Sequence, residues 1–182
     1  MGRMLLGALV GSIVLFAWGF LYWAVLPIAD NIVLPVPNEA AVAQMLKENI
    51  PSSGVYYIPG EGAKERSQAW VEKHKAGPIA QIFFRREGIN PTDPMFYARG
   101  FGYMLFCAFL GAWLLKTALP GLESYAARAI FVVMVGFFGA AVAFSGAVWW
   151  YQWLPYHLLY VAFNVTAWVF AGLAMAAIVK PD

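Results

Sequence analysis

Four residues near the C-terminal end of the chain have the types and spacing of a polar strip on one helix: His157, Tyr160, Asn164 and Trp168. Their i, i+3, i+7, i+11 positions fall on the same face of an α-helix. An imidazole and a carboxamide on one face can hydrogen-bond the polar head group of a lipophilic molecule. The walls of such a site would come from three preceding tryptophans: Trp149, Trp150 and Trp153. This pattern supports the hypothesis of a quinone- or lipid-binding site.

The same residues also have a purely structural interpretation. Tyr160 and Asn164 could join neighbouring membrane helices through hydrogen bonds worth about 1 kcal/mol each. His157 and the tryptophans could belong to the belt of amphipathic aromatic side chains that forms at a membrane–water interface. Both interpretations place this helix face near the surface of a bilayer, and the sequence leaves both of them open.

Other reactive residue types do not form a recognisable active site. A zinc site needs three or four clustered ligands, whereas this chain offers only two histidines and one cysteine: His74, His157 and Cys107. A single cysteine excludes an intramolecular disulfide and a CxxC motif. We therefore expect no catalytic residues and no metal site, and the sequence indicates no cofactor.

Two short aromatic segments have the composition of β-strands and form the other candidate for function. A small sheet with aromatic faces offers an edge to which a protein partner can add a strand. The candidate partner-binding residues are Tyr56, Tyr57, Ile58, Phe83 and Phe84. The alternative is that both strands bury these side chains against neighbouring helices of the same chain.

The composition places these segments in a membrane protein. Hydrophobic residues make up 62% of the 182 residues and charged residues 12%, whereas soluble domains average about 45–50% and 25%. A membrane-crossing helix needs about 20 apolar residues. Uncharged windows cover residues 4–29, 100–115 and 129–179, and the last is long enough for two crossings. Four membrane-spanning helices are therefore expected.

The expected fold class is an all-α membrane protein, a bundle of four transmembrane helices with a small α-β-α-β module between the first two. Residues 1–29 would form the first helix, which we expect to be uncleaved, and residues 30–93 the module. Residues 94–182 would form three further helices at about 94–117, 124–150 and 155–178. Small residues suited to close helix packing are Gly7, Gly11, Gly136 and Gly139.

The module is expected to contain a helix from Asn38 to about Glu48, a strand over 53–58, a helix over 63–75 and a strand over 79–84. Asn38 is a favoured N-cap residue, and Pro59-Gly60 ends the first strand. Two strands and two short helices bury little apolar surface, and two-stranded sheets are marginally stable alone. The module should therefore depend on its surroundings.

Basic residues near the ends of the predicted helices give an orientation. Arg3, Lys116, Arg128 and Lys180 fall on one side of the membrane, and the Trp149–Pro155 loop on the other side has no Lys or Arg. By the positive-inside rule both termini are cytoplasmic and residues 30–93 lie outside. We expect a bacterial cytoplasmic (inner) membrane. A net charge of +2 gives no indication of a nucleic-acid partner.

These patterns lead to two hypotheses of function. The first is a non-enzymatic protein that acts by contact, as an accessory, assembly or scaffold subunit of a larger membrane complex or as a small homo-oligomer. Its partners would be the lipid bilayer and another membrane protein or a second copy of itself. The second is a membrane-embedded quinone- or lipid-binding protein that uses the polar strip beginning at His157.

Overall fold

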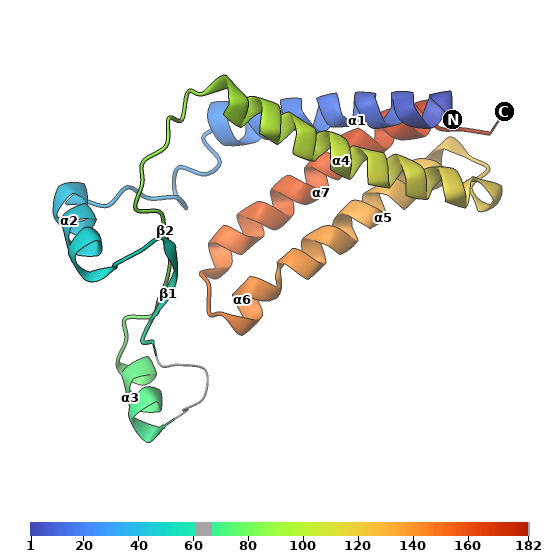
Figure 1. The fold of residues 1–182 in the computed structure, drawn as a ribbon. Coiled ribbons are helices and arrows are strands. Elements are labelled where there is room, and N and C mark those ends of the chain that lie inside the picture. The colour runs from blue at the N-terminus through green and yellow to red at the C-terminus, as the bar shows by residue number, and fades with distance from the viewer. Residues whose placement is uncertain (61–66, 182) are drawn as a thin grey trace.

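The four expected long helices are present in the computed structural model, which describes residues 1–60 and 67–181. The segments long and apolar enough to cross a membrane are Gly2–Val25, Pro94–Gly121, Tyr125–Trp149 and Leu154–Ile178. Figure 1 shows them side by side as the larger part of the molecule. Length and apolar composition together indicate an integral membrane protein.

The bounds of these helices follow local sequence signals. Helix α1 covers Gly2–Phe20 and continues as a π-helical segment, η1, over Leu21–Val25. Helix α4 covers Pro94–Ala118 and is followed by a 3₁₀ turn, η2, at Leu119–Gly121. At its start, the Asp93 side chain accepts a hydrogen bond from the Met95 amide, and Pro94 occupies the first helical position, where no amide proton is needed.

The third and fourth spans differ in regularity. Helix α5 covers Tyr125–Ala143, and a short helix, α6, covers Ser145–Trp149, so the helix expected over 124–150 is interrupted at Phe144. The Ser124 side chain caps α5 by accepting a hydrogen bond from the Ala127 amide. Helix α7 covers Leu154–Ile178 without a break. The chain thus bends at the end of the third span, just before the aromatic loop.

The four helices pack in the order α4, α1, α7, α5. Helix α1 contacts both α4 and α7, α5 packs mainly on α7, and α4 touches α5 only lightly. The buried core is rich in alanine, which allows close approach, and includes Ala8, Ala108, Ala112, Ala167 and Ala171. The bundle is therefore more tightly closed along α1 and α7 than between α4 and α5.

The expected packing glycines have different surroundings. A β-carbon on Gly7 would lie 2.4 Å from Val179, and one on Gly11 would lie 2.7 Å from the sulfur of Met175. A β-carbon on Gly136 would lie 2.1 Å from the Trp168 ring, whereas one on Gly139 would have nothing within 4 Å. The first three glycines thus permit helix contacts within this chain, and Gly139 faces open space.

Both described chain ends lie at one end of the bundle, opposite the module (Figure 1). Arg3 donates hydrogen bonds to the carbonyls of Lys180 and Pro181, at 3.3 and 2.9 Å. Arg128 is only 7% exposed and donates to the carbonyls of Ala176 and Glu123, at 3.2 and 2.9 Å. A guanidinium at the C-terminal end of α7 also complements the negative end of the helix dipole.

The module has the expected α-β-α-β order: helix α2 at Glu39–Asn49, strand β1 at Gly54–Ile58, helix α3 at Gln68–Ala76 and strand β2 at Ala80–Phe84. The strands pair antiparallel. Asn38 caps α2 and Ser67 caps α3. The second helix was expected from residue 63, but residues 61–66 lie outside the described part of the chain.

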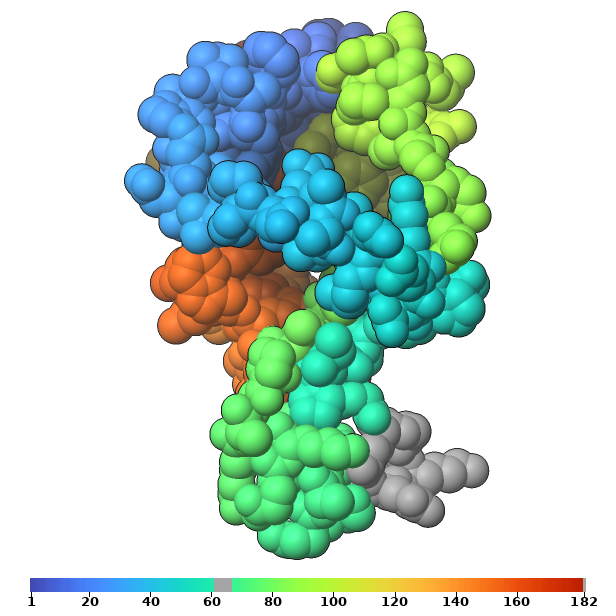
Figure 2. All heavy atoms as spheres, turned by 90° about the vertical axis from the view of Figure 1, so that its left-hand side faces the viewer, coloured from blue at the N-terminus to red at the C-terminus, as the bar shows by residue number. Residues whose placement is uncertain are grey.

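The module has almost no core of its own. Among the described residues from 26 to 93, only Ile50 is buried, and neither α2 nor α3 contains a buried residue. Figure 2, which views the molecule from the module end, shows the α3 lobe projecting away from the long helices. The module is therefore held by a few specific contacts rather than by burial of apolar surface.

Candidate functional site: a groove and a polar chain at the module end of the helices

A groove of about 150 Å³ lies between α5 and α7. Its walls combine small and aromatic residues with three polar side chains on α7, and its lining residues are Ala140, Ala143, Phe144, Tyr156, His157, Tyr160, Val161 and Asn164. Small residues at Ala140 and Ala143 leave space beside α7. The groove is thus formed where the third span approaches its break at Phe144.

Three of the four residues in the predicted polar strip line this groove: His157, Tyr160 and Asn164. The fourth, Trp168, lies elsewhere, because its ring packs against Gly136 of α5 and is also within 3.0 Å of the β-carbon position of Gly111 of α4. Trp168 therefore fills the space between helices.

The tryptophans that were predicted to form the walls lie outside this groove. Trp149, Trp150 and Trp153 do not line the groove, and their side chains are 75, 55 and 56% exposed. The aromatic walls come from Phe144 and Tyr156 instead. Tyr156 immediately precedes His157, and helical spacing from Tyr160 could have identified it, since i and i+4 residues are neighbours on a helix.

The aromatic loop contains a polar contact that connects the groove to the module. His157 Nε2 lies 2.5 Å from Gln152 Oε1. The amide nitrogen of Gln152 donates to the side-chain oxygen of Gln81 in β2, and Gln81 in turn donates to the Tyr57 hydroxyl in β1 at 2.7 Å. Four side chains thus form a continuous chain of hydrogen bonds from helix α7 to the sheet.

The orientation of Gln152 in this polar chain favours one tautomer of neutral His157. Because Gln152 uses its amide nitrogen on Gln81, only its carbonyl oxygen faces the imidazole, and a carbonyl can only accept. His157 Nε2 therefore carries a proton and donates. In a neutral imidazole the other nitrogen, Nδ1, is then an acceptor.

Gly146 makes room for this contact. A β-carbon at Gly146 would lie 2.4 Å from Gln152 Oε1 and 3.0 Å from His157 Cε1. The break between α5 and α6 thus brings a residue without a side chain beside the His157–Gln152 pair. Next to the pair, the ring of Trp150 packs on Tyr57 with their centroids 5.4 Å apart.

One interpretation of the sequence expected Asn164 to hydrogen-bond to a neighbouring helix, but its observed hydrogen bond lies within its own helix. Its side-chain nitrogen donates to the carbonyl of Tyr160 in the same helix, at 2.8 Å. No partner for its side-chain oxygen is found in the described part of the chain. The Tyr160 ring packs beside Trp23 and Tyr156, with centroids 4.9 Å away in both cases.

Two polar links that the sequence did not reveal join the first span to α7, one from α1 and one from η1. Trp18 Nε1 donates to the Thr166 hydroxyl at 2.9 Å, and the buried Tyr22 hydroxyl donates to the Leu159 carbonyl at 3.0 Å. From the sequence, Trp18 and Tyr22 could be interpreted only as aromatic residues at the membrane–water interface. These two bonds set the position of the first span along α7. Helix α7 also forms one wall of the groove.

The strand residues proposed to bind a partner divide between two faces of the sheet. Val55 pairs with Phe83 and Tyr57 pairs with Gln81, so these four side chains share one face. Tyr56, Ile82 and Phe84 lie on the other face and are half-buried. Phe83 is 72% exposed and Val55 50% exposed, so within the described chain neither α2 nor α3 covers this pair.

The end of the sheet is fastened to α2 by polar contacts. Arg86 donates to the carbonyls of Lys47 and Ile50, both at 2.9 Å. The Ser53 hydroxyl accepts from the Arg86 amide and donates to a Glu87 carboxylate oxygen, both at 2.9 Å. This hydroxyl stabilises the ionised carboxylate, so it lowers the pKa of Glu87, with smaller contributions from Arg85 and Arg86.

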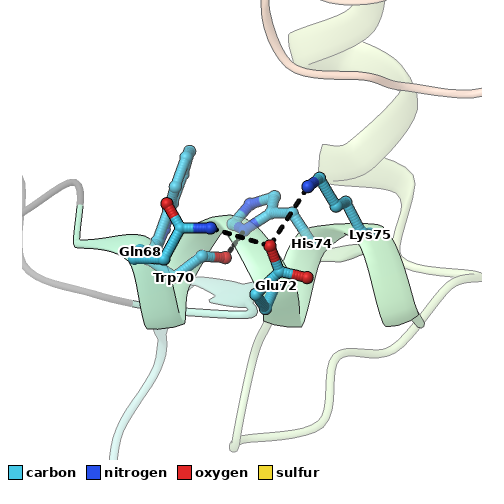
Figure 3. Close-up of polar contacts among 5 residues, drawn as sticks. All are labelled: Gln68, Trp70, Glu72, His74 and Lys75. Atoms are coloured by element: carbon cyan, nitrogen blue, oxygen red, sulfur yellow. Dashed lines mark hydrogen bonds and ion pairs between the residues drawn. The ribbon is translucent and has the colours of Figure 1, made fainter.

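His74 is engaged within its own helix. Its Nδ1 lies 2.9 Å from the Trp70 carbonyl, and its ring packs against the Trp70 ring at an angle of 43°, with centroids 3.8 Å apart (Figure 3). Glu72, on the same helix, accepts from Gln68 and Lys75 at 2.9 and 3.1 Å. Within residues 1–60 and 67–181, no three His, Cys, Asp or Glu side chains gather as a metal site.

The four long apolar helices indicate that this protein belongs to the class of integral membrane proteins, and a small module lies at one end of these helices. No protein-family model, no curated protein and no solved structure matches this chain.

Proposed function

We propose that this chain is a non-enzymatic membrane protein that acts by contact, as an accessory, assembly or scaffold subunit of a larger membrane complex or as a small homo-oligomer. The observation that carries this proposal is the exposed apolar face of the sheet. Phe83 and Val55 lie together on this face and are not covered within the described chain. Because only one of the module's described residues is buried, covering these two apolar side chains with a partner would be favourable.

The way the module is held supports the same proposal. The face that carries Phe83 is also the face from which Gln81 and Tyr57 reach the loop between α6 and α7. The polar chain therefore positions the exposed pair at the end of the spans. A partner that lies in the same membrane and has its own segment on that side would meet this face.

The orientation of the protein is part of this proposal. Arg3, Lys116, Arg128 and Lys180 belong to the ends of the spans that lie opposite the module. The positive-inside rule then places both described ends in the cytoplasm and residues 30–93 outside, and the membrane we propose is the bacterial cytoplasmic membrane.

Single cysteines test this orientation in a Cys107→Ser background. A membrane-impermeant maleimide added to intact cells should label Phe83→Cys, because residue 83 is exposed on the outer side. Lys116→Cys, the control, should be labelled only after lysis. The reverse pattern would contradict the proposed orientation.

Native mass spectrometry after gentle extraction tests the contact function itself. The expected result is a stoichiometric assembly, either with a different membrane protein or with further copies of the 20.1-kDa chain. The substitution Phe83→Ser should reduce that assembly while leaving the helices folded, since Phe83 makes no core contact. A wild-type protein that is monomeric at every detergent concentration would contradict the proposal.

A further inference from the structure

The geometry points to a second function that does not depend on the first. The groove between α5 and α7 is a binding site for a lipophilic molecule whose small head group carries hydroxyl donors, and this head group bonds to His157 and Asn164. The chemical class includes the reduced, hydroxyl-bearing form of a quinone and lipids with a free hydroxyl. The volume of the groove, its position and its open hydrogen-bonding groups support this assignment.

The volume of the groove suits one small head group. A cavity of about 150 Å³ holds a single six-membered ring in proteins, and the groove has this volume. Phe144 and Tyr156 supply flat apolar surfaces, and Ala140 and Ala143 supply the depth. The tail of a larger ligand would have to leave the groove and lie among lipid chains.

The position of the groove suits a molecule that reaches it from the bilayer. His157 lies in the first turn of α7, beside the aromatic loop, and Asn164 lies two turns deeper, on the order of 10 Å along the helix. One end of the groove is therefore near the membrane surface and the other within the apolar region. An amphipathic ligand matches this gradient, because its head can stay polar while its tail is buried.

The open hydrogen-bonding groups favour a hydroxyl, which can both donate and accept. His157 Nδ1 is an acceptor because Nε2 donates to Gln152. Asn164 gives one amide proton to Tyr160, and within the described chain its oxygen has no partner. In an apolar setting an acceptor without a partner is costly. A hydroxyl group can donate to these acceptors and can also accept the second amide proton of Asn164, whereas a ketone oxygen in the same place could use only that proton.

Binding by three probes tests the inference on the full chain in detergent micelles. Decylubiquinol and decylubiquinone have the same ring and tail and differ in their hydroxyl protons, and dioleoylglycerol offers a lipid hydroxyl. Native mass spectrometry under anaerobic conditions would give the bound fraction of each probe during a titration. Because one hydrogen bond contributes up to about a tenfold change in affinity, decylubiquinol should bind about tenfold more tightly than decylubiquinone.

Substitutions assign the binding to the groove. Asn164→Leu removes an acceptor and should lower decylubiquinol binding to the level of decylubiquinone. Ala143→Phe fills the groove from an exposed position and should abolish binding of both, with Ala143→Leu as the milder version if the larger residue disturbs folding. Phe138→Leu changes an exposed α5 residue outside the groove and should bind as wild type does.

The possible results distinguish a quinol ligand from a lipid ligand, and both from results that contradict the inference. Preference for decylubiquinol that Asn164→Leu removes supports a quinol site. Binding of dioleoylglycerol with the same dependence on Asn164, and no binding of decylubiquinol, supports a lipid hydroxyl in the same groove. Equal binding of quinol and quinone, or binding that Asn164→Leu and Ala143→Phe leave unchanged, would overturn the inference. None of these results depends on whether a protein partner binds Phe83.

Discussion

Gln152, in the loop before α7, donates a hydrogen bond to the side chain of Gln81, which lies 71 positions earlier in the module. Gln152 also accepts from His157, so a single side chain connects the groove, the loop and the sheet. The module buries only Ile50 among its described residues. Its position therefore depends on polar and aromatic contacts at this point.

Gln152→Ala should loosen the module without unfolding the helices. Loss of a hydrogen bond of about 1 kcal/mol corresponds to roughly a fivefold change in an opening equilibrium. Hydrogen exchange followed by mass spectrometry should show amides of β1 and β2 exchanging about that much faster. Gln44→Ala, which removes a bond within α2, is the matched control. Unchanged exchange in both strands would show that other contacts hold the module.

Gly136 and Gly139, both on α5, provide a matched pair of substitutions that tests helix packing. Gly136→Ala should destabilise the protein by about 1–3 kcal/mol, because the new methyl group meets the Trp168 ring in a packed interior. Gly139→Ala should be neutral or slightly stabilising, since nothing lies within 4 Å and alanine favours helix. Thermal unfolding in one detergent measures both. Equal effects of the two substitutions would contradict the observed packing of Trp168.

Arg128 should stabilise the end of the helix bundle that lies opposite the module. Arg128→Gln removes charged donors from the carbonyls of Ala176 and Glu123 and should cost about 2 kcal/mol, since bonds to charged groups are worth about 1.5–3 kcal/mol. Lys180→Gln, at an exposed position of the same end, should change stability far less. The unfolding temperatures of the two variants provide the measurement, and equal values would argue against a structural role for the buried guanidinium.

The Ser53–Glu87 contact should respond to acid. The pKa of Glu87 in the folded state lies below its ordinary value. The contact therefore contributes its full stability at a pH above the ordinary pKa, and this contribution is lost as the pH falls through the lowered pKa. Glu87 is fully exposed, so the change should be confined to the local contact. The Arg86 amide resonance, whose proton Ser53 accepts, should titrate at a lower pH in wild type than in Ser53→Ala. Identical midpoints would contradict the assigned cause.

Much of the fold could be predicted because it depends on local patterns. Uncharged windows gave the four helices, and Asp93-Pro94 gave the start of α4. The groove was partly predictable for the same reason, since the helical spacing of His157, Tyr160 and Asn164 is a property of one segment.

The remaining features depend on tertiary contacts that no local pattern contains. The contact between Gln81 and Gln152 joins a strand to a distant loop, and it forms only because α5 breaks at Phe144 and Gly146 leaves room beside His157. The tryptophans were assigned to the groove because they are near His157 in sequence, whereas the turn into α7 directs them elsewhere. Asn164 donates one amide proton to a carbonyl of its own helix, and the sequence did not reveal this contact.

Site-specific photocrosslinking in intact cells tests the central claim, that the exposed face of the sheet contacts a protein partner. A benzophenone amino acid at Phe83 should give one discrete crosslinked product, of fixed mass, either to a second copy of the chain or to one other membrane protein. The same amino acid at Lys75, exposed on α3, should give no such product. Equal crosslinking from both positions, or no product at Phe83, would contradict a contact function for this face.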